Sequence, residues 1–262
     1  MGDSNDNNIS EMYDVLFVLQ VMTRQIALSE YKGYFVLMGD TAFMPMLNEK
    51  NLDTYMRSTH DIDLYVSSES AWQSFKRDIV QILNSNQDGV QYQITNFKKR
   101  STTSDSINLI ASYKGTEYRL KIDRNVSLFK TITVTYLSSA GMNAYDCDTM
   151  IVDKVSAICS QKVYRQSKDL YDLYVLSQIR QYSLNSLVNY IKVKRPEFFT
   201  SGVNMLVPQN YASLEHAYSK YRGLLNKPEF DAMFKICSSF ICPFFSLDTI
   251  NRDLYWNGEY WI

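Results

Sequence analysis

Apolar and polar residues alternate along the segment 61–66, and this period of two predicts a half-buried β-strand. Its apolar residues would point into a core, while Asp61 and Asp63 would lie together on the opposite face. Two carboxylates at that spacing repel each other unless a cation lies between them, and oxygen ligands of this kind hold Mg²⁺ on substrate phosphates. The pair therefore indicates a metal site; the alternative is a solvated strand edge.

A second alternating segment, 117–123, predicts a strand whose polar face carries Lys121 and ends in a third carboxylate, Asp123. The apolar segment 107–113 precedes it, and the turn residues 114–116 separate the two, so a β-hairpin is expected. Three acids on adjacent strands could hold two Mg²⁺ ions that clamp the phosphates of a nucleotide and activate an attacking hydroxyl.

The segment 34–47 predicts a buried strand, a turn at Gly39, Asp40 and Thr41, and then a short helix over 42–47. A glycine in the turn lets the backbone approach a ligand closely, and the free N–H groups at the start of a helix attract anions. The segment is therefore a candidate phosphate-binding turn. The alternative is an ordinary turn in which Asp40 or Thr41 caps the helix.

The stretch 150–179 predicts two helices. Lys154 falls on the apolar stripe of the first and needs a negative partner, unless its side chain extends from the edge of the stripe to solvent. If it contacts a nucleotide, replacing it should weaken NTP binding at little cost in stability. The second helix carries four charged residues on one face: Arg165, Lys168, Asp169 and Asp172. They are either site residues or a solvated, salt-bridged surface.

Five short motifs occur in the same order as in one known family: Met38–Ala42, Arg57–Leu64, Ile122–Asp123, Asp153–Lys154 and Lys168–Leu173. In these motifs, over roughly residues 30 to 180, the chain resembles the AbiEii/AbiGii-type toxin nucleotidyltransferases of the DNA polymerase β-like superfamily. The resemblance implies an α+β fold class. It implies a minimal nucleotidyltransferase fold, which is a small mixed β-sheet with flanking helices, followed by a helical C-terminal domain.

The resemblance also implies roles for individual residues, with an NTP as substrate and two Mg²⁺ ions as cofactors. The metal ligands would be Asp61, Asp63 and Asp123. The nucleotide would be bound by Gly39, Asp40, Thr41, Arg57, Ser58, Lys154, Lys168 and Asp172. The catalytic group would comprise Asp61, Asp63, Asp123, Lys154 and Asp169.

One position departs from the family pattern. Where the family usually has Gly-Gly-Ser or Gly-Gly-Thr, this chain has Gly39, Asp40 and Thr41. Asp tolerates a left-handed backbone better than most residues, so the turn can persist, but its carboxylate would lie beside a triphosphate. Either Asp40 faces away and caps the following helix, or it weakens nucleotide binding, or this protein binds something other than a free NTP.

The overall composition limits the candidate partners. The 262 residues carry a net charge of −1, which gives no general attraction to nucleic acid, although basic clusters at 98–100 and 192–195 could form local patches. No apolar run approaches the roughly 18 residues of a membrane span, and the polar N-terminus is unlike a signal peptide. A cytoplasmic protein without a membrane partner is therefore expected.

A domain boundary is expected near residue 144. It would separate a nucleotidyltransferase core, 1–144, from a mostly helical domain, 145–262, which contributes Lys154 and the Lys-Asp-Leu-Tyr-Asp motif that begins at Lys168. Most of the many aromatic residues beyond position 210 should form the core of a small helical bundle. A minority could stack on unpaired bases or bind a partner protein.

Three functions are compatible with these features. The first is Mg²⁺-dependent transfer of a nucleotidyl group from an NTP to a macromolecule. The family resemblance favours RNA, and tRNA in particular, as the acceptor. It also implies that the protein acts as the toxin of a toxin–antitoxin or phage-defence system and has a cognate antitoxin. The second is NMPylation of a protein hydroxyl by the same fold. The third is a catalytically degenerate binding partner, which Asp40 favours and which the three acids and Lys154 argue against.

Overall fold

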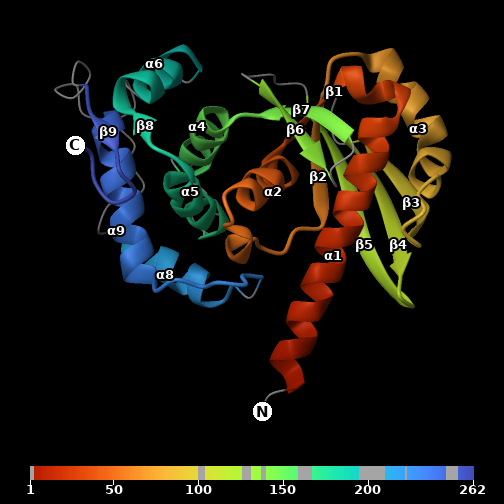
Figure 1. Ribbon diagram of the computed structural model, residues 1–262, viewed down its shortest axis with the longest axis horizontal. Coiled ribbons are helices and arrows are strands. Elements are labelled where there is room, and N and C mark those ends of the chain that lie inside the picture. The colour runs from red at the N-terminus through yellow and green to blue at the C-terminus, as the bar shows by residue number, and fades with distance from the viewer. Residues whose placement is uncertain are drawn as a thin grey trace. The chain divides into compact units, whose positions relative to one another are not determined.

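The computed structural model describes residues 3–99, 104–125, 131–136, 140–158, 167–194, 210–221, 223–245 and 253–262 (Figure 1). Contacts within the chain divide it into two compact units, Met1–Asp146 and Cys147–Ile262. Both helices and a mixed sheet are present, so the α+β fold class is confirmed. Within the described part of the chain, no helix combines the length and apolar character needed to cross a membrane.

The first unit is built on a seven-stranded sheet with the strand order β3-β4-β5-β2-β1-β7-β6 in the described residues. The strands are β1 (Phe35–Met38), β2 (Asp61–Val66), β3 (Gln91–Lys99), β4 (Asp105–Tyr113), β5 (Thr116–Asn125), β6 (Thr131–Tyr136) and β7 (Ala140–Tyr145). β2 pairs in parallel with β5, and β1 in parallel with β7, whereas the other neighbours are antiparallel. The sheet is therefore mixed, as expected for the proposed fold.

Alternation explains which face of this sheet is buried. Ile62, Leu64 and Ile122 are fully buried, and the residues between them on β2 and β5 are half-buried or exposed. Helices α1 (Asp3–Leu28) and α3 (Glu69–Asn84) pack beside each other and against this sheet (Figure 1). The predicted strand over 61–66 is confirmed, and its acidic face is the one that the core does not cover.

The predicted hairpin is also confirmed. β4 and β5 pair in antiparallel register up to Tyr113 and Thr116, and only Lys114 and Gly115 connect them. Both connecting residues have positive φ angles, 50° and 80°, as a tight two-residue hairpin turn requires. Asp123 does not end its strand, because β5 continues for two residues to Asn125 and its pairing with β2 continues with it.

Strand β1 leads directly into α2 (Gly39–Glu49), and the short 3₁₀ helices η1 (Glu30–Tyr34) and η2 (Asp53–Tyr55) lie on either side of this pair in the sequence. The prediction of a turn over residues 39–41 before the helix is wrong, because these residues form the first turn of α2 itself. No separate turn is needed, since Gly39 takes a left-handed φ of 58° and changes the chain direction within one residue.

The second unit is mostly helical in its described residues. Its elements are α4 (Cys147–Ile158), α5 (Ser167–Ile179), β8 (Tyr182–Ser183), α6 (Leu184–Lys194), α8 (Tyr211–Ser219), α9 (Phe230–Ile241), η5 (Cys242–Phe245) and β9 (Tyr255–Trp256). Helices α4 and α5 confirm the two predicted between residues 150 and 179. Arg165 of the predicted charged face lies outside the described residues.

The aromatic residues of this unit form its core. Tyr182, Phe240, Phe244 and Trp256 are buried, and the ring of Trp261 stacks on Phe240 with a centroid distance of 5.5 Å. The last residues fold back so that the backbone N–H groups of positions 255 and 262 each donate to the carbonyl of the other, at 2.8 and 2.9 Å. Their packing supports the structural interpretation over base stacking, although Tyr255 and Tyr260 remain exposed.

Candidate functional site

The parallel pairing of β2 with β5 brings the three predicted acids onto one face. Asp63 lies opposite Asp123, and Asp61 lies opposite Lys121. Residues that are opposite in a sheet point to the same side, and this side is the one that the apolar residues of both strands avoid. Two strands that are distant in sequence thus place three carboxylates and one ammonium group side by side.

Lys121 lies between two of these carboxylates. Its Nζ is 2.6 Å from Oδ2 of Asp123 and 3.4 Å from Oδ2 of Asp61. Thr59 completes this part of the site, because its hydroxyl donates to Oδ1 of Asp61 at 2.8 Å. Neither Lys121 nor Thr59 is among the predicted site residues. The alternation of β5 does place Lys121 on the acidic face, so that part of the signal is present in the sequence.

Asp63 has the most perturbed environment of the three acids. Burial, as the largest cause, and the negative charges of Asp61, Asp40 and Asp123 together raise the pKa of its carboxyl to about 6, although the positive charge of Lys121 lowers it. The side-chain amide of Asn125 lies 3.5 Å from Oδ1 of Asp63. The ammonium of Lys121 therefore does not offset the combined effect of burial and of the neighbouring carboxylates on this group.

Gly39 lies against Asp63 where β1 passes into α2. A Cβ atom at this position would come within 2.7 Å of Oδ2 of Asp63, and the positive φ of Gly39 is unfavourable for other residues. Glycine is therefore required here both for its conformation and for the close approach. Thr41 is fully buried, and its hydroxyl lies 3.3 Å from the carbonyl of Met38, to which it donates.

Asp40 forms an ion pair with the guanidinium of Arg57. Arg57 is buried, with 7% of its side chain exposed, and its Nη1 also donates to the carbonyl of Ser58 at 3.4 Å. The half-buried Ser58 therefore contributes a backbone contact to this pair. The acidic residue that departs from the family pattern has a cation beside it, supplied by the motif that carries Asp61 and Asp63.

The remaining predicted site residues belong to the second unit. Nζ of Lys154 is 3.1 Å from Oδ1 of Asp169 and 2.6 Å from Oδ2 of Asp172, and only 1% of the Asp172 side chain is exposed. The prediction that the lysine on the apolar stripe needs a negative partner is confirmed. Lys168, on the same helix as the two acids, is exposed.

The acids of the first unit fit a hard cation in their chemistry. Mg²⁺ takes oxygen ligands, and three carboxylates share this face beside the close approach of Gly39. Ser106, opposite Asp123 on β4, is buried, and its hydroxyl has no hydrogen-bond partner among the described residues. In the described part of the chain, no three His, Cys, Asp or Glu side chains converge as a metal site, and Lys121 is the cation between Asp61 and Asp123.

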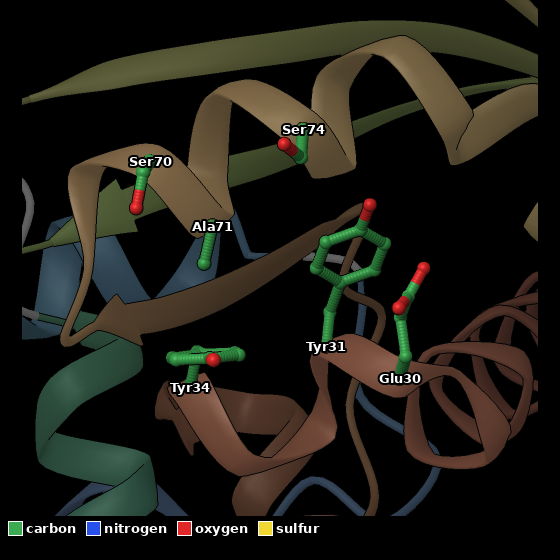
Figure 2. Close-up of a pocket in the computed structure, with 6 residues that line it drawn as sticks. All are labelled: Glu30, Tyr31, Tyr34, Ser70, Ala71 and Ser74. Atoms are coloured by element: carbon green, nitrogen blue, oxygen red, sulfur yellow. The ribbon is translucent and has the colours of Figure 1, made fainter.

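Two cavities lie away from these acids. One, of about 320 Å³, lies between η1 and α3, where Tyr31 and Tyr34 lie across from Ser70 and Ser74 (Figure 2). A hydrogen bond to Asp78 raises the pKa of Tyr31 to about 12 and keeps its hydroxyl protonated. The other, of about 380 Å³, is lined by residues of α1, α2, η2 and the β4–β5 hairpin, among them Tyr13 and Tyr113. Neither is lined by a predicted site residue.

Two solved structures share the fold of this chain. They are the structure of JHP933 from Helicobacter pylori, with 13% sequence identity, and the structure of a Helicobacter pylori protein provisionally described as a nucleotidyltransferase, with 14% identity. Both have a TM-score of 0.55, and each comparison covers 90% of this chain, with 92% and 95% of the other chain respectively. The similarity extends over nearly the whole of each protein and supports the predicted fold.

Sequence comparison identifies the family. No curated protein matches the chain. The family model described as nucleotidyl transferase AbiEii toxin, type IV toxin–antitoxin system, matches residues 20–235. This match includes β1, α2, β2, β5, α4 and α5, which together with the segment 57–60 carry the five motifs. Because the match covers well over half of the chain, the protein is a nucleotidyltransferase that belongs to the AbiEii toxin family of type IV toxin–antitoxin systems.

Proposed function

We propose that this enzyme transfers a nucleoside monophosphate from an NTP to RNA, with tRNA as the preferred class, and acts as the toxin of a toxin–antitoxin or phage-defence system. Family membership itself implies an NTP substrate and an antitoxin partner. The observation that carries the proposal is the set of Asp61, Asp63 and Asp123 on one face of β2 and β5, next to the glycine that begins α2.

In the proposed reaction, Asp61, Asp63 and Asp123 would hold Mg²⁺, which would supply positive charge to stabilise the triphosphate and to make the acceptor hydroxyl more acidic. The acceptor oxygen forms a bond to the α-phosphorus, the bond to pyrophosphate breaks, and the hydroxyl proton passes to a carboxylate of the site. The raised pKa of Asp63 supports the metal-binding role of the three acids, because a cation bound between carboxylates relieves their mutual repulsion.

The phosphates of the NTP would meet the start of α2. Gly39 allows close approach, the N–H groups of the first turn favour an anion, and Arg57 supplies a buried positive charge beside Asp40. The hydroxyl of Thr41 is directed to the backbone in the structure, so its backbone N–H is the better candidate for a contact. The nucleotide-binding roles of Ser58, Lys154, Lys168 and Asp172 stay predictions of the family resemblance, as does the catalytic role of Asp169.

The acceptor assignment is supported by a cross-strand row of residues. Asp63 pairs with Asp123, Asp123 with Ser106, and Ser106 with Lys98 on the edge strand β3. Three strand spacings separate the ends of this row, about 14 Å, which corresponds to two or three nucleotides of an extended strand. An exposed lysine at that distance could bind a phosphate of an RNA whose end reaches the acids.

The other predicted basic residues add less to this proposal. Lys99 lies next to Lys98 but is opposite Asp105, on the other face of the sheet. Lys192 is half-buried in α6, which ends with Lys194. Arg100 and Arg195 lie outside the described residues. Lys98 is therefore the basic residue for which the strand register gives a specific expectation.

The proposal is tested by incubating the protein with each α-labelled NTP, Mg²⁺ and total cellular extract. We expect label in RNA, no label with Asp61→Asn, and normal labelling with Asp53→Asn, which removes an exposed acid of the same unit. Label in a protein band instead of RNA would replace the acceptor with a protein and leave nucleotidyl transfer in place. Equal labelling by the wild type and Asp61→Asn would contradict the proposed metal site.

A further inference from the structure

Lys121 is held among the acids by the backbone. Its N–H donates to the carbonyl of His60 at 2.9 Å, immediately before β2, so its position on β5 is fixed opposite Asp61. From there its ammonium reaches Asp123 at 2.6 Å and Asp61 at 3.4 Å. A quarter of the side chain, 26%, is exposed, so the ammonium can leave this position without disrupting packing. The contact is thus specified by the sheet and is also reversible.

We propose that Lys121 is the resident counter-cation of the carboxylate site and that it makes metal binding depend on the nucleotide. This inference rests on the proposed function. In the protein without substrate, Lys121 neutralises Asp61 and Asp123 and competes with a free divalent cation for their oxygens. When metal and triphosphate arrive together, Lys121 exchanges the two carboxylates for a phosphate oxygen and then stabilises the nucleotide.

The charges of the site explain why a competitor of this kind matters. Three acids on one face attract divalent cations whether or not substrate is present, and a metal bound without nucleotide occupies the site unproductively. A tethered ammonium lowers the affinity for the metal alone. It lowers the affinity for a metal–NTP complex much less, because the phosphates provide a new partner for the ammonium.

The test compares metal binding by the wild-type protein and the Lys121→Met variant at pH 8 without nucleotide, using Mn²⁺ as the probe and its spin-resonance signal as the readout. We expect Lys121→Met to bind Mn²⁺ about tenfold more tightly, since one nearby positive charge is lost. In the presence of Mg²⁺, the same variant should bind NTP about tenfold more weakly, because a phosphate loses an ammonium partner. The opposite directions of the two effects are the signature of the exchange.

Arg119→Gln is the matched control. Arg119 is exposed, lies two residues before Lys121 on the same face of β5, and carries the same charge. We expect its affinities for Mn²⁺ and NTP to match the wild type. If Lys121→Met does not fold, Lys121→Gln keeps a hydrogen-bond donor for Asp123 and should show the same two changes.

Unchanged Mn²⁺ affinity in a folded Lys121 variant would overturn the proposal, as would equal tightening by Arg119→Gln, which would indicate a general effect of net charge. Because Mn²⁺ binding is measured without NTP or acceptor, this outcome does not depend on the transfer reaction. A protein that binds Mn²⁺ as expected but labels neither RNA nor protein would contradict the proposed function and leave the metal-competition part of the inference standing.

Discussion

Each unit of this protein contains a lysine clamped between two aspartates, and the two clusters differ in how open they are. The sheet cluster comprises Lys121, Asp61 and Asp123, and the helix cluster comprises Lys154, Asp169 and Asp172. In both, the shorter contact is 2.6 Å. The side chains of the sheet cluster are 26%, 35% and 16% exposed, whereas those of the helix cluster are 14%, 14% and 1% exposed.

The surroundings of the two clusters differ as well. Asp63 and Asp40 add negative charge next to the sheet cluster, and Arg57 forms an ion pair with Asp40. The helix cluster is instead packed between α4 and α5, on the apolar stripe of the former. The same combination of one lysine and two aspartates therefore forms an exchangeable ionic site in the sheet cluster and a fixed ionic contact in the helix cluster. Accessibility and excess charge decide between these outcomes.

Removing the lysine of the helix cluster should have the largest effect. Lys154→Ala leaves the carboxylate of Asp172 buried without this ammonium, and losing one partner of a buried ion pair costs about 3–5 kcal/mol in the free energy of unfolding. This expectation replaces the small cost that the apolar stripe alone suggested. Urea denaturation of the whole protein, followed by a probe in the second unit, would measure this loss in the free energy of unfolding. The control is Lys168→Ala, which removes an exposed lysine nearby.

A small loss of stability together with weaker NTP binding in Lys154→Ala would break the comparison. The helix cluster would then behave as an exchangeable site like the sheet cluster, and Lys154 would act on the nucleotide as the family resemblance implies.

Substitution of Asp63, the acid beside the sheet cluster, should lower the enzymatic activity and not disrupt the fold. Asp63→Asn should reduce nucleotidyl transfer by more than about 10²-fold, because a metal ligand is lost while the fold is kept. Single-turnover labelling with saturating Mg²⁺ measures the loss, and circular dichroism checks the fold. Full activity in this variant would remove Asp63 from the metal site, and the Asp61→Asn variant would then show whether the strand face matters at all.

The pH dependence of stability tests the excess charge directly. Since the pKa of Asp63 is raised from 3.8 to about 6, its ionisation destabilises the metal-free folded protein, fully so above pH 6. As pH falls through 6 toward 4, the folded protein takes up a proton before the unfolded one does, and this cost disappears. Asp63→Asn should thus be more stable than the wild type at pH 8, on the order of 1–3 kcal/mol, and lose that advantage by pH 4.

Denaturation of both proteins in chelator at pH 4, 6 and 8 provides the measurement. A constant difference between the two proteins across this range would mean that Asp63 titrates as an ordinary carboxyl. Of the two proteins, the wild type should also gain more stability at pH 8 from Mg²⁺ added together with an NTP, because the metal and nucleotide bind only the folded state.

Local patterns account for the parts of the site that could be predicted. The alternation of Ile62 and Leu64 with Asp61 and Asp63 is sufficient to define a strand and its acidic face. The same argument defines the β4–β5 hairpin. By contrast, α1 is not among the predicted elements, although its buried residues, such as Val15, Val18, Leu19 and Met22, recur at helical spacing.

Contacts between distant segments could not be predicted, and they distinguish the two clusters. Lys121 contacts Asp61 only because β2 and β5 pair in parallel, in a register that no local pattern encodes. Asp40 and Arg57 are likewise brought together by α2 and the segment before β2. Sequence reasoning could place each of these residues on a face of its element, but the pairing of the elements determines which charge lies beside which.

The Asp40–Arg57 pair provides a smaller test of charge at the sheet site. Asp40→Asn removes a negative charge that contributes to the raised pKa of Asp63, and it removes the carboxylate beside Arg57. We expect NTP binding at fixed Mg²⁺ to tighten severalfold, on the order of 1 kcal/mol. Titration with a fluorescent NTP measures this, and Asp53→Asn controls for net charge. Reduced stability with unchanged NTP affinity would instead make the pair a structural contact.

The smallest effect concerns the acceptor and compares two neighbouring lysines on β3. Lys98 lies in the cross-strand row that contains Asp123 and Asp63, while Lys99 lies opposite Asp105 on the other face. Both are exposed and carry the same charge, so Lys98→Glu and Lys99→Glu change the net charge equally. If RNA follows the acidic face, Lys98→Glu should lower RNA labelling severalfold and Lys99→Glu should lower it much less.

The two variants should bind NTP equally, since neither residue adjoins Gly39 or the acids. The deficit of Lys98→Glu should shrink as salt rises, because a phosphate contact is screened and the wild type loses its advantage. An equal loss of RNA labelling in both variants would indicate that RNA is attracted by positive charge in general and does not follow the acidic face. Equal labelling by both variants and the wild type would place the acceptor elsewhere, and the open sheet cluster would then differ from the helix cluster in metal exchange alone.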